Sequence, residues 1–336
     1  MRGGGSGGRR ERETGERSVS GGTGGGTGGW NAMMVDSTAL PGQAVRDIGT
    51  SAFQSAGQRC SAWRARCVQR DSAPALLEML EGAARELQIG DPWDPATDVG
   101  PVIDAEARQA IESHCAELDA DGRLLFRVEL PVESTGDFTA PAAFRLDSFN
   151  QLTREVFGPV LHVIEYEADE LDAIVDQINA AGYGLTLGVH SRIDARVDRI
   201  CARAAVGNIY VNRNQIGAVV EAQPFGGDGL SGTGPKAGGP HYLSRFTRCA
   251  SGLAVSPQDR ALPGPTGERN SYALHPRGAV LCLADDPVAL QALCDKAAAL
   301  GNSAMRLSDL GMSADAALST ADFDAVLIAD ETDSAR

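Results

Sequence analysis

The stretch SAFQSAGQRCSAWRARC, from Ser51 to Cys67, places Cys60 directly behind Gly57, Gln58 and Arg59. Glycine and small neighbours let the backbone come close to a bound molecule. A thiolate near cations or backbone N–H groups is a reactive nucleophile, and such N–H groups can stabilise an oxyanion. A lone cysteine behind a helix is also typical of a small buried side chain. From these residues alone both interpretations of Cys60 stay open.

Apolar spacing on either side of this stretch predicts alternating strands and helices. Small or apolar residues at helical spacing, Ala44, Ile48, Ala52 and Ser55, favour a helix within 39–60, although Gly49 weakens it. Further helices are predicted in 73–91, 169–184 and 194–207, and strands in 31–36, 159–166, 185–191 and 208–212. Such alternation is typical of an α/β domain with a parallel-rich sheet and flanking helices.

The two ends of the chain differ from this central part. Residues 1–29 hold 13 of the 40 glycines and almost no apolar side chains, which predicts a disordered leader. We assign 30–250 to the α/β domain and 251–275, rich in proline and glycine, to a linker. Residues 276–336 contain a strand, a helix and a second strand, and they predict a small, partial α/β domain with a βαβ-like pattern.

Composition excludes several classes of function. The 336 residues carry a net charge of −15, whereas nucleic acid and anionic membranes attract clustered lysine and arginine. The seven cysteines are odd in number and show neither a CxxC pair nor a zinc-type cluster with histidine, so we expect free thiols and no metal. No apolar run approaches a membrane span, and the N-terminus lacks the apolar region of a secretory signal, so we predict a cytoplasmic protein.

Two further segments favour ligand binding. REVFGPVL, residues 154–161, puts a carboxylate (Glu155) and an aromatic ring (Phe157) at a turn, where they could hold a ribose and a flat ring; a surface glutamate and a core phenylalanine are the alternative. The glycine-rich segment 212–246 predicts loops where the backbone approaches a ligand, or else a series of surface turns. Its GLSGTG stretch lacks the GK[ST] ending of a phosphate loop, and it does not open a helix after a strand, which argues against a dinucleotide-binding fingerprint.

Together, SAGQRCSA, REVFGPVLHV and QPFGGDGLSGTGPKAGGPHYL resemble the aldehyde dehydrogenase superfamily. More narrowly, the chain from about Gly28 to at least Arg277 is similar to the L-glutamate γ-semialdehyde (pyrroline-5-carboxylate) dehydrogenase region of the bifunctional proline utilization A enzymes. The resemblance implies NAD-dependent oxidation of that aldehyde in proline catabolism. It also implies a homo-oligomer in the full-length family, and FAD only in a proline dehydrogenase half that this chain does not contain.

The resemblance implies a role for individual residues. Cys60 would attack the aldehyde, Glu155 would hold the nicotinamide ribose, and Phe157 would lie beside the cofactor. The substrate's α-carboxylate would be anchored, and its aliphatic chain packed, by Ser61, the backbone of Gly217 and Ala218, and Phe225.

The chain departs from the family pattern at one catalytic position. The family's general base opens an E-x-G-G-x-N motif, which here reads GTGGWN from Gly26 to Asn31. Gly26 therefore stands where a glutamate is expected, and the family's NAD-binding domain would lie mostly before it. We expect a fragment that is weakly active or inactive alone. The alternatives are a non-catalytic assembly fragment of the same family or an aldehyde dehydrogenase of other specificity.

Overall fold

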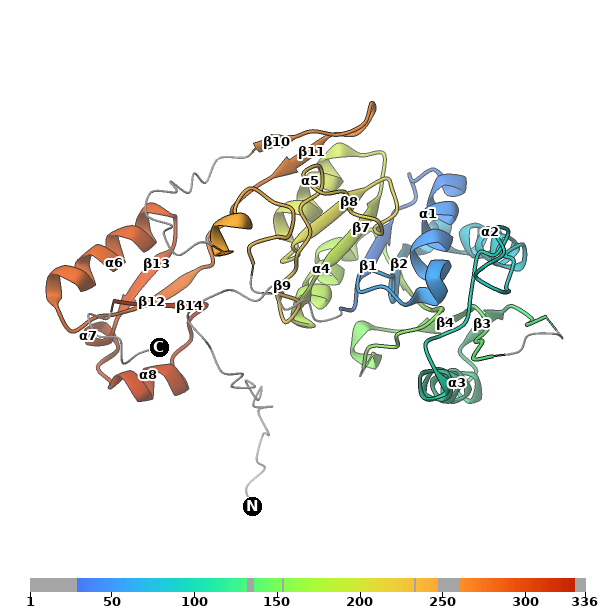
Figure 1. The fold of residues 1–336 in the computed structure, drawn as a ribbon, viewed down its shortest axis with the longest axis horizontal. Helices are drawn as coiled ribbons and strands as arrows, with labels where there is room; N and C mark the ends of the chain where they lie inside the picture. The colour runs from blue at the N-terminus through green and yellow to red at the C-terminus, as the bar shows by residue number, and fades with distance from the viewer. Residues whose placement is uncertain (1–28, 132–135, 153, 233, 247–259, 330–336) are drawn as a thin grey trace, which may run out of the picture. The chain divides into compact units, whose positions relative to one another are not determined.

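The computed structural model describes residues 29–131, 136–152, 154–232, 234–246 and 260–329 (Figure 1). The chain divides into a larger unit within residues 23–243 and a smaller unit that contains the described residues from 260 onward. Residues 1–28 of the predicted leader, including Gly26, lie outside the described residues.

A seven-stranded sheet forms the centre of the larger unit, in the order β3-β4-β5-β2-β1-β7-β8. All neighbouring pairs are parallel except β3 with β4. The elements of this unit are β1 (Ala32–Val35), α1 (Pro41–Phe53), β2 (Ala65–Gln69), α2 (Ala73–Arg85), α3 (Ala105–Ala120), β3 (Leu124–Arg127), β4 (Ala142–Leu146), β5 (Val160–Tyr166), α4 (Leu171–Ala180), β6 (Tyr183–Gly184), β7 (Thr186–His190), α5 (Asp194–Arg203), β8 (Asn208–Val211) and β9 (Asp228–Gly229). Short 3₁₀ turns occupy Gln54–Gly57, Arg70–Ser72, Phe149–Gln151, Ala168–Glu170 and Leu243–Phe246.

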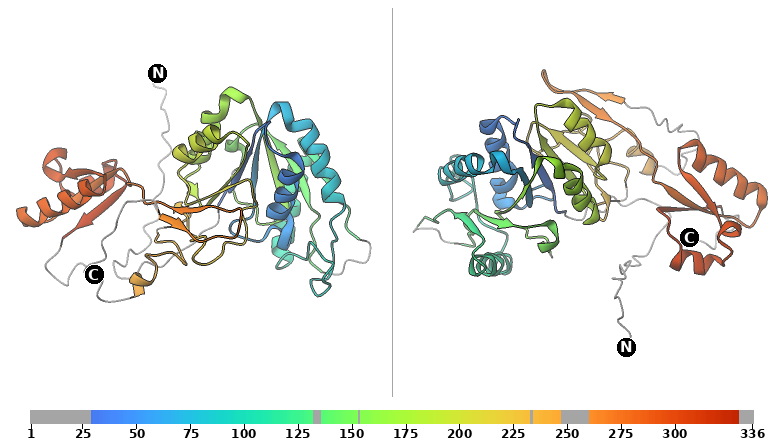
Figure 2. Two further views of the ribbon diagram at one scale, coloured as in Figure 1. Left: turned by 90° about the horizontal axis from the view of Figure 1, so that it is seen from above. Right: turned by 180° about the vertical axis from the view of Figure 1, so that it is seen from behind.

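Strand β1 is buried on both faces and separates two apolar layers. Met33 and Val35 pack in a cluster with buried residues of α1, α2 and α3, whereas Ala32 and Met34 pack with buried residues of α4 and α5. Figure 2 shows α1 and α2 on one side of the sheet and α4 and α5 on the other. A strand covered on both sides is expected to be continuously apolar, as AMMV is. The predicted fold class, a parallel-rich sheet with flanking helices, is confirmed.

Helix α1 ends earlier than its spacing predicts. Ala44, Ile48 and Ala52 are buried as expected, but the helix stops at Phe53. Ser55 is exposed and, with Ala56, adopts a positive φ, so the expectation that Ser55 lies on the buried face is wrong. Two left-handed residues cannot continue a right-handed helix, and they turn the chain toward Cys60.

The amino ends of four parallel strands meet at one edge of the sheet. Ala32 pairs with both Ala65 and Leu187, and Ala65 pairs with His162, so β1, β2, β5 and β7 begin side by side. The segments that enter these strands include Asn31, Cys60 and Glu155. Parts of the chain far apart in sequence are thereby brought to a common edge.

The smaller unit has its own parallel sheet, in the order β13-β12-β14. It contains β10 (Arg260–Leu262), β11 (Asn270–Tyr272), β12 (Ala279–Leu283), α6 (Pro287–Ala299), β13 (Ser303–Arg306), α7 (Leu307–Leu310), α8 (Ala314–Thr320) and β14 (Ala325–Ile328). The predicted strand–helix–strand pattern corresponds to β12, α6 and β14, while β13 was not predicted. The segment 251–275, expected as a linker, contains the antiparallel pair β10–β11. In the described parts of both units, no helix is long and apolar enough to cross a membrane.

Candidate active site

Cys60 lies in a loop between α1 and β2, which we call the nucleophile loop (residues 57–64). The Cys60 side chain is exposed and forms no disulfide, so its interpretation as a buried filler is wrong. The loop is closed by a turn in which Ala62 N donates to Arg59 O at 2.9 Å. Trp63 N donates to Ser51 O at 3.0 Å, which fastens the loop to the last turn of α1. The sulfur is thus presented to solvent on an ordered backbone.

Two glycines bring the nucleophile loop against the REVFGPVL turn. Gly57 has a φ of +66°, and a Cβ placed on it would lie 2.2 Å from Gly158 O and 2.8 Å from Ala52 O. A Cβ on Gly158 would lie 2.4 Å from the Ile111 side chain. Both glycines are therefore required by close approach, and Gly57 also by its left-handed backbone. Their contact places Cys60 near the turn that carries Glu155 and Phe157.

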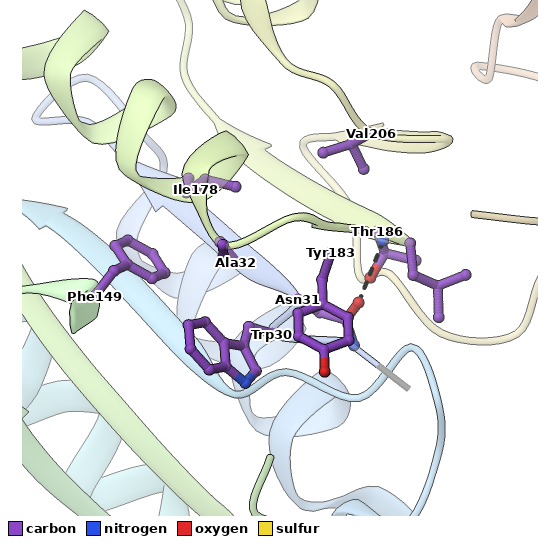
Figure 3. A pocket seen from close by; sticks show the side chains of 10 residues that line it. Trp30, Asn31, Ala32, Phe149, Ile178, Tyr183, Thr186 and Val206 are labelled. Atoms are coloured by element: carbon purple, nitrogen blue, oxygen red, sulfur yellow. Dashed lines mark hydrogen bonds between the residues drawn. The ribbon is translucent and has the colours of Figure 1, made fainter. Parts of the chain in front are cut away.

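Asn31 holds the loop from the side of β1. Its buried side chain donates from Nδ2 to Cys60 O at 2.6 Å and to Ala62 O at 2.8 Å. Its Oδ1 accepts from Thr186 N at 3.3 Å, the contact drawn as a dashed line in Figure 3. One amide therefore links the backbone of Cys60 to the first residue of β7.

Arg64 is a buried cation beneath the same loop, with only 1% of its side chain exposed. Its Nη1 donates to Gly57 O at 2.7 Å and its Nη2 to Arg59 O at 3.2 Å. Burial lowers the pKa of Arg64 to about 10, against the opposing effect of Glu155 and, more weakly, Cys60. A group with that pKa remains a cation at neutral pH, so a fixed positive charge lies under the loop that carries Cys60.

Glu155 and Phe157 have the exposure that a cofactor site requires. Glu155 keeps 24% of its side chain exposed, and its Oε1 accepts from Gly29 N at 3.3 Å. Phe157 is 42% exposed, and its ring lies 4.8 Å from the Arg64 guanidinium carbon. The interpretation of Phe157 as a core residue is wrong, because its side chain is exposed while the neighbouring Val156 is buried.

The segment with Gly217 and Ala218 reaches the nucleophile loop through Ser51. Gln215 N donates to Ser51 Oγ at 3.2 Å, while Ser51 O accepts from Trp63 N. Gly217 has a φ of +75° and is exposed, whereas Ser61 is buried.

Phe225 stands apart from these contacts. Its backbone pairs with Ala237 in an isolated bridge, at 3.0 and 2.9 Å. Among the residues that the structure describes, no hydrogen bond or ring contact joins Phe225 to Cys60. Its role against a substrate therefore stays a prediction.

Sequence reasoning did not single out three residues that build this site: Asn31, Arg64 and Gln58. Gln58 joins the loop to the segment before α3, donating to Pro101 O at 3.2 Å and accepting from Ile103 N at 2.8 Å. Asn31 was visible as the last letter of the E-x-G-G-x-N pattern. Arg64 was visible as a charge inside SAWRARCV, a segment otherwise suited to a core strand.

A small pocket opens at the same edge of the sheet (Figure 3). Trp30 and Tyr183, whose ring centroids lie 5.8 Å apart, form one wall, and Ile178 of α4 and Phe149 form another. Asn31 and Thr186 also line it, so the residue that holds the loop of Cys60 contributes to this pocket. Within the described ranges, no group of histidine, cysteine and carboxylate side chains could hold a metal ion.

Comparison with known proteins identifies the family. Residues 26–251 match the family described as "Aldehyde dehydrogenase family". The chain belongs to the aldehyde dehydrogenase family. It is 47% identical over 316 residues to the "Bifunctional protein PutA" of Klebsiella aerogenes, a match that covers 77% of this chain and 24% of that protein. The "1-pyrroline-5-carboxylate dehydrogenase" of Geobacillus sp. (strain WCH70) is 37% identical over 218 residues, covering 64% of this chain and 42% of that one.

Solved structures agree with this assignment to the aldehyde dehydrogenase family. A mutant of Bradyrhizobium japonicum Proline Utilization A (PutA) matches with a TM-score of 0.64 and 59% identity, over 66% of this chain and 22% of that one. A 1-pyrroline-5-carboxylate dehydrogenase structure matches with a TM-score of 0.60 and 35% identity. The predicted resemblance is thus confirmed. The chain spans about a quarter of the length of the curated PutA proteins that it matches, at 24–26%.

Proposed function

We propose that this chain carries the catalytic domain for NAD-dependent oxidation of L-glutamate γ-semialdehyde to glutamate in proline catabolism. One observation carries the proposal: Cys60 is exposed on a loop held from below by Arg64 and from the side by Asn31, directly against the Glu155–Phe157 turn. The similarity to PutA and 1-pyrroline-5-carboxylate dehydrogenase supports this choice of aldehyde. The homo-oligomer implied by the resemblance stays a prediction.

The chemistry that we propose begins at the sulfur. The Cys60 thiolate donates an electron pair to the carbonyl carbon, the C–S bond forms, and the carbonyl π electrons move to oxygen. Backbone N–H groups near the loop would stabilise that oxyanion. Loss of hydride from the same carbon restores the C=O bond and leaves a thioester on Cys60. Water then cleaves the C–S bond, releasing the carboxylic acid and the thiol.

The residues of the REVFGPVL turn fit the nicotinamide half of a dinucleotide. A partly exposed carboxylate can accept from both hydroxyls of a ribose, and the exposed face of Phe157 can lie against a flat ring. When bound, NAD⁺ supplies the acceptor for the hydride. Glu155 and Phe157 would orient that acceptor beside Cys60, because the close approach of Gly57 to Gly158 brings the two segments together.

The choice of a carboxylate-bearing aldehyde depends on the other side of the loop. A hydroxyl and backbone N–H groups can bind a carboxylate without a buried cation. Ser61, Gly217 and Ala218 are the residues that we assign to this anchor, and Phe225 to the aliphatic chain. The link through Ser51 supports the first three, since it joins the 215–218 segment to the nucleophile loop.

Hydrolysis of an activated ester tests the nucleophile without a cofactor. We expect the chain to release p-nitrophenol from p-nitrophenyl acetate, and Cys60→Ala to abolish that release. Cys201→Ala, which removes a half-buried thiol of α5, serves as the matched control and should retain the wild-type rate. Equal rates for wild type and Cys60→Ala would instead favour the non-catalytic module, the alternative that Gly26 in place of the family's glutamate supports.

A further inference from the structure

A fully buried guanidinium is costly unless its donors are satisfied, so its partners show what it does. Arg64 directs its two terminal nitrogens at carbonyls on either side of Gln58, those of Gly57 and Arg59. The planar fork of arginine can donate to two diverging acceptors at once, whereas the single ammonium of lysine cannot do so in the same geometry. The guanidinium thereby fixes the backbone that leads into Cys60.

The main chain of Arg64 is itself part of the sheet edge. Its N–H donates to Asn31 O at 3.2 Å, and its carbonyl accepts from His162 N at 3.1 Å and from His162 Nδ1 at 2.7 Å. The residue is therefore anchored between the starts of β1 and β5. From that anchor the side chain of Arg64 extends back beneath the nucleophile loop. The guanidinium therefore connects the loop to the sheet.

The same guanidinium also contacts the Glu155–Phe157 turn. Arg64 Nε lies 3.6 Å from Glu155 Oε1, beyond hydrogen-bond distance, and it has no hydrogen-bond partner among the residues that the structure describes. The guanidinium carbon lies 4.8 Å from the centre of the Phe157 ring, within the range of a cation–π contact. One buried group thus touches both the segment that carries the sulfur and the two side chains that we assign to the nicotinamide half.

We propose that Arg64 is a positioning residue that sets the separation between Cys60 and the Glu155–Phe157 turn. Its catalytic consequence rests on the proposed function, because it acts through Cys60. Its effect on the loop does not rest on that function and is measurable on its own. Misplacing a reacting group by about 1 Å can cost about a hundredfold in rate, so loss of the fork should be visible in turnover.

The test compares Arg64→Lys, which keeps the charge and loses the fork, with Arg85→Lys, which alters an exposed ion pair on α2. In p-nitrophenyl acetate hydrolysis we expect Arg64→Lys to lower kcat at least about tenfold. KM should stay within about twofold, because a small neutral ester does not need the fork to bind. In hydrogen exchange, the amides of residues 57–62 should exchange faster in Arg64→Lys, with those of β1 and β5 unchanged, and Arg85→Lys should match wild type in both assays.

Two results would overturn the proposal: a kcat for Arg64→Lys within twofold of wild type, or faster exchange across the whole sheet, which would indicate a general structural role. If Cys60→Ala retains hydrolysis, the proposed function fails, and the role of Arg64 is then tested only by the hydrogen exchange of residues 57–62.

If Arg64→Lys does not fold, hydrogen exchange in the wild-type chain tests the proposal instead. The amides of Gln58 and Ala62 should then be protected at least about a hundredfold relative to an unstructured peptide, and open-loop rates would refute the anchor.

Discussion

Acidification should destabilise the larger unit through one buried imidazole, His162 of β5. Arg64 O is a carbonyl and can only accept, so His162 Nδ1 must carry the proton of their 2.7 Å contact. His162 Nε2 is then an acceptor, and it receives its hydrogen bond from Nε2 of His114 at 2.8 Å. A proton added to His162 would place two hydrogens in that 2.8 Å gap. The fold therefore holds His162 in its neutral form.

The magnitude follows from the displaced pKa. Burial lowers the pKa of His162 from 6.5 to about 3, with the charges of His114 and Arg64 adding to the effect and the hydrogen bond to Arg64 O opposing it. Below pH 6.5 the imidazole of His162 becomes protonated in the unfolded chain but stays neutral in the folded chain. The contribution of His162 to the free energy of unfolding is therefore fully present above pH 6.5 and is lost as the pH falls toward 3. At about 1.4 kcal/mol per unit, the free energy of unfolding should fall by about 2 kcal/mol at pH 5. The lowered pKa of His114 contributes with the same sign.

Urea unfolding at pH 7.5 and pH 5.0 measures this effect. Trp30, Trp63 and Trp93 are the only tryptophans and all lie in the larger unit, so their fluorescence reports that unit alone. His162→Gln can still donate to Arg64 O but cannot be protonated. Its stability should therefore change with pH by about 2 kcal/mol less than that of wild type. His275→Gln, at an exposed histidine of the smaller unit, should leave the pH dependence unchanged. Equal pH dependence in wild type and His162→Gln would refute the reasoning.

Three further substitutions test the site. Gly57→Ala should lower the free energy of unfolding by about 2 kcal/mol or more and abolish ester hydrolysis, because Gly57 has a positive φ and the new Cβ would meet Gly158 O. In the same urea titration, the control Gly82→Ala should raise the free energy of unfolding by about 0.5–1 kcal/mol, because open space surrounds its Cβ. Asn31→Asp replaces the donating amide by a carboxylate that faces the carbonyls of Cys60 and Ala62, and it should lower the free energy of unfolding by about 2–3 kcal/mol. A variant as stable as wild type would contradict the two contacts. Gly26→Glu supplies the general base that the family has at this position, so hydrolysis of the acyl-enzyme should become about 10²- to 10⁴-fold faster. The steady-state release of p-nitrophenol after the initial burst measures this step. An unchanged steady-state rate would count against the assignment of the motif.

The fold could be predicted where one periodicity dominates. In α4, Leu171, Ile174 and Ile178 are buried as their spacing predicts, and the helix is followed by Gly182 at a φ of +78°. Strands β1, β5, β7 and β8 lie within the predicted ranges, because buried parallel strands form short apolar runs between turns. Strand β2 was missed, since Arg64 and Arg66 interrupt its apolar run. Helix α3 was missed because only Ile111 and Cys115 of its residues are buried, which leaves a weak pattern.

The site was less predictable than the fold, since its contacts join segments distant in sequence. Gly57 and Gly158 are separated by a hundred positions, and neither letter shows that each is a glycine because of a close approach to another part of the chain. Arg64 illustrates the same limit. A charge among apolar residues argues against burial when the sequence is read locally, and only the carbonyls of the turn before Cys60 explain how it is accommodated.

The position of the site on the sheet also has a physical reason. In open α/β sheets, ligands commonly bind at the carboxyl ends of the strands, where the order of the sheet reverses. Here that edge, at the ends of β1 and β7, holds a buried network in which Asp36 accepts from Ser191 Oγ, Thr38 and Arg196. Burial alone would raise the pKa of Asp36, but these hydrogen bonds outweigh it and lower the pKa. Asp36 is thus satisfied by its neighbours at that edge. At the amino edge, the chain keeps Cys60, Glu155 and Phe157 partly or fully exposed. The active site that we propose therefore lies at the amino edge, where these groups remain open to solvent, whereas the topological rule alone points to the carboxyl edge.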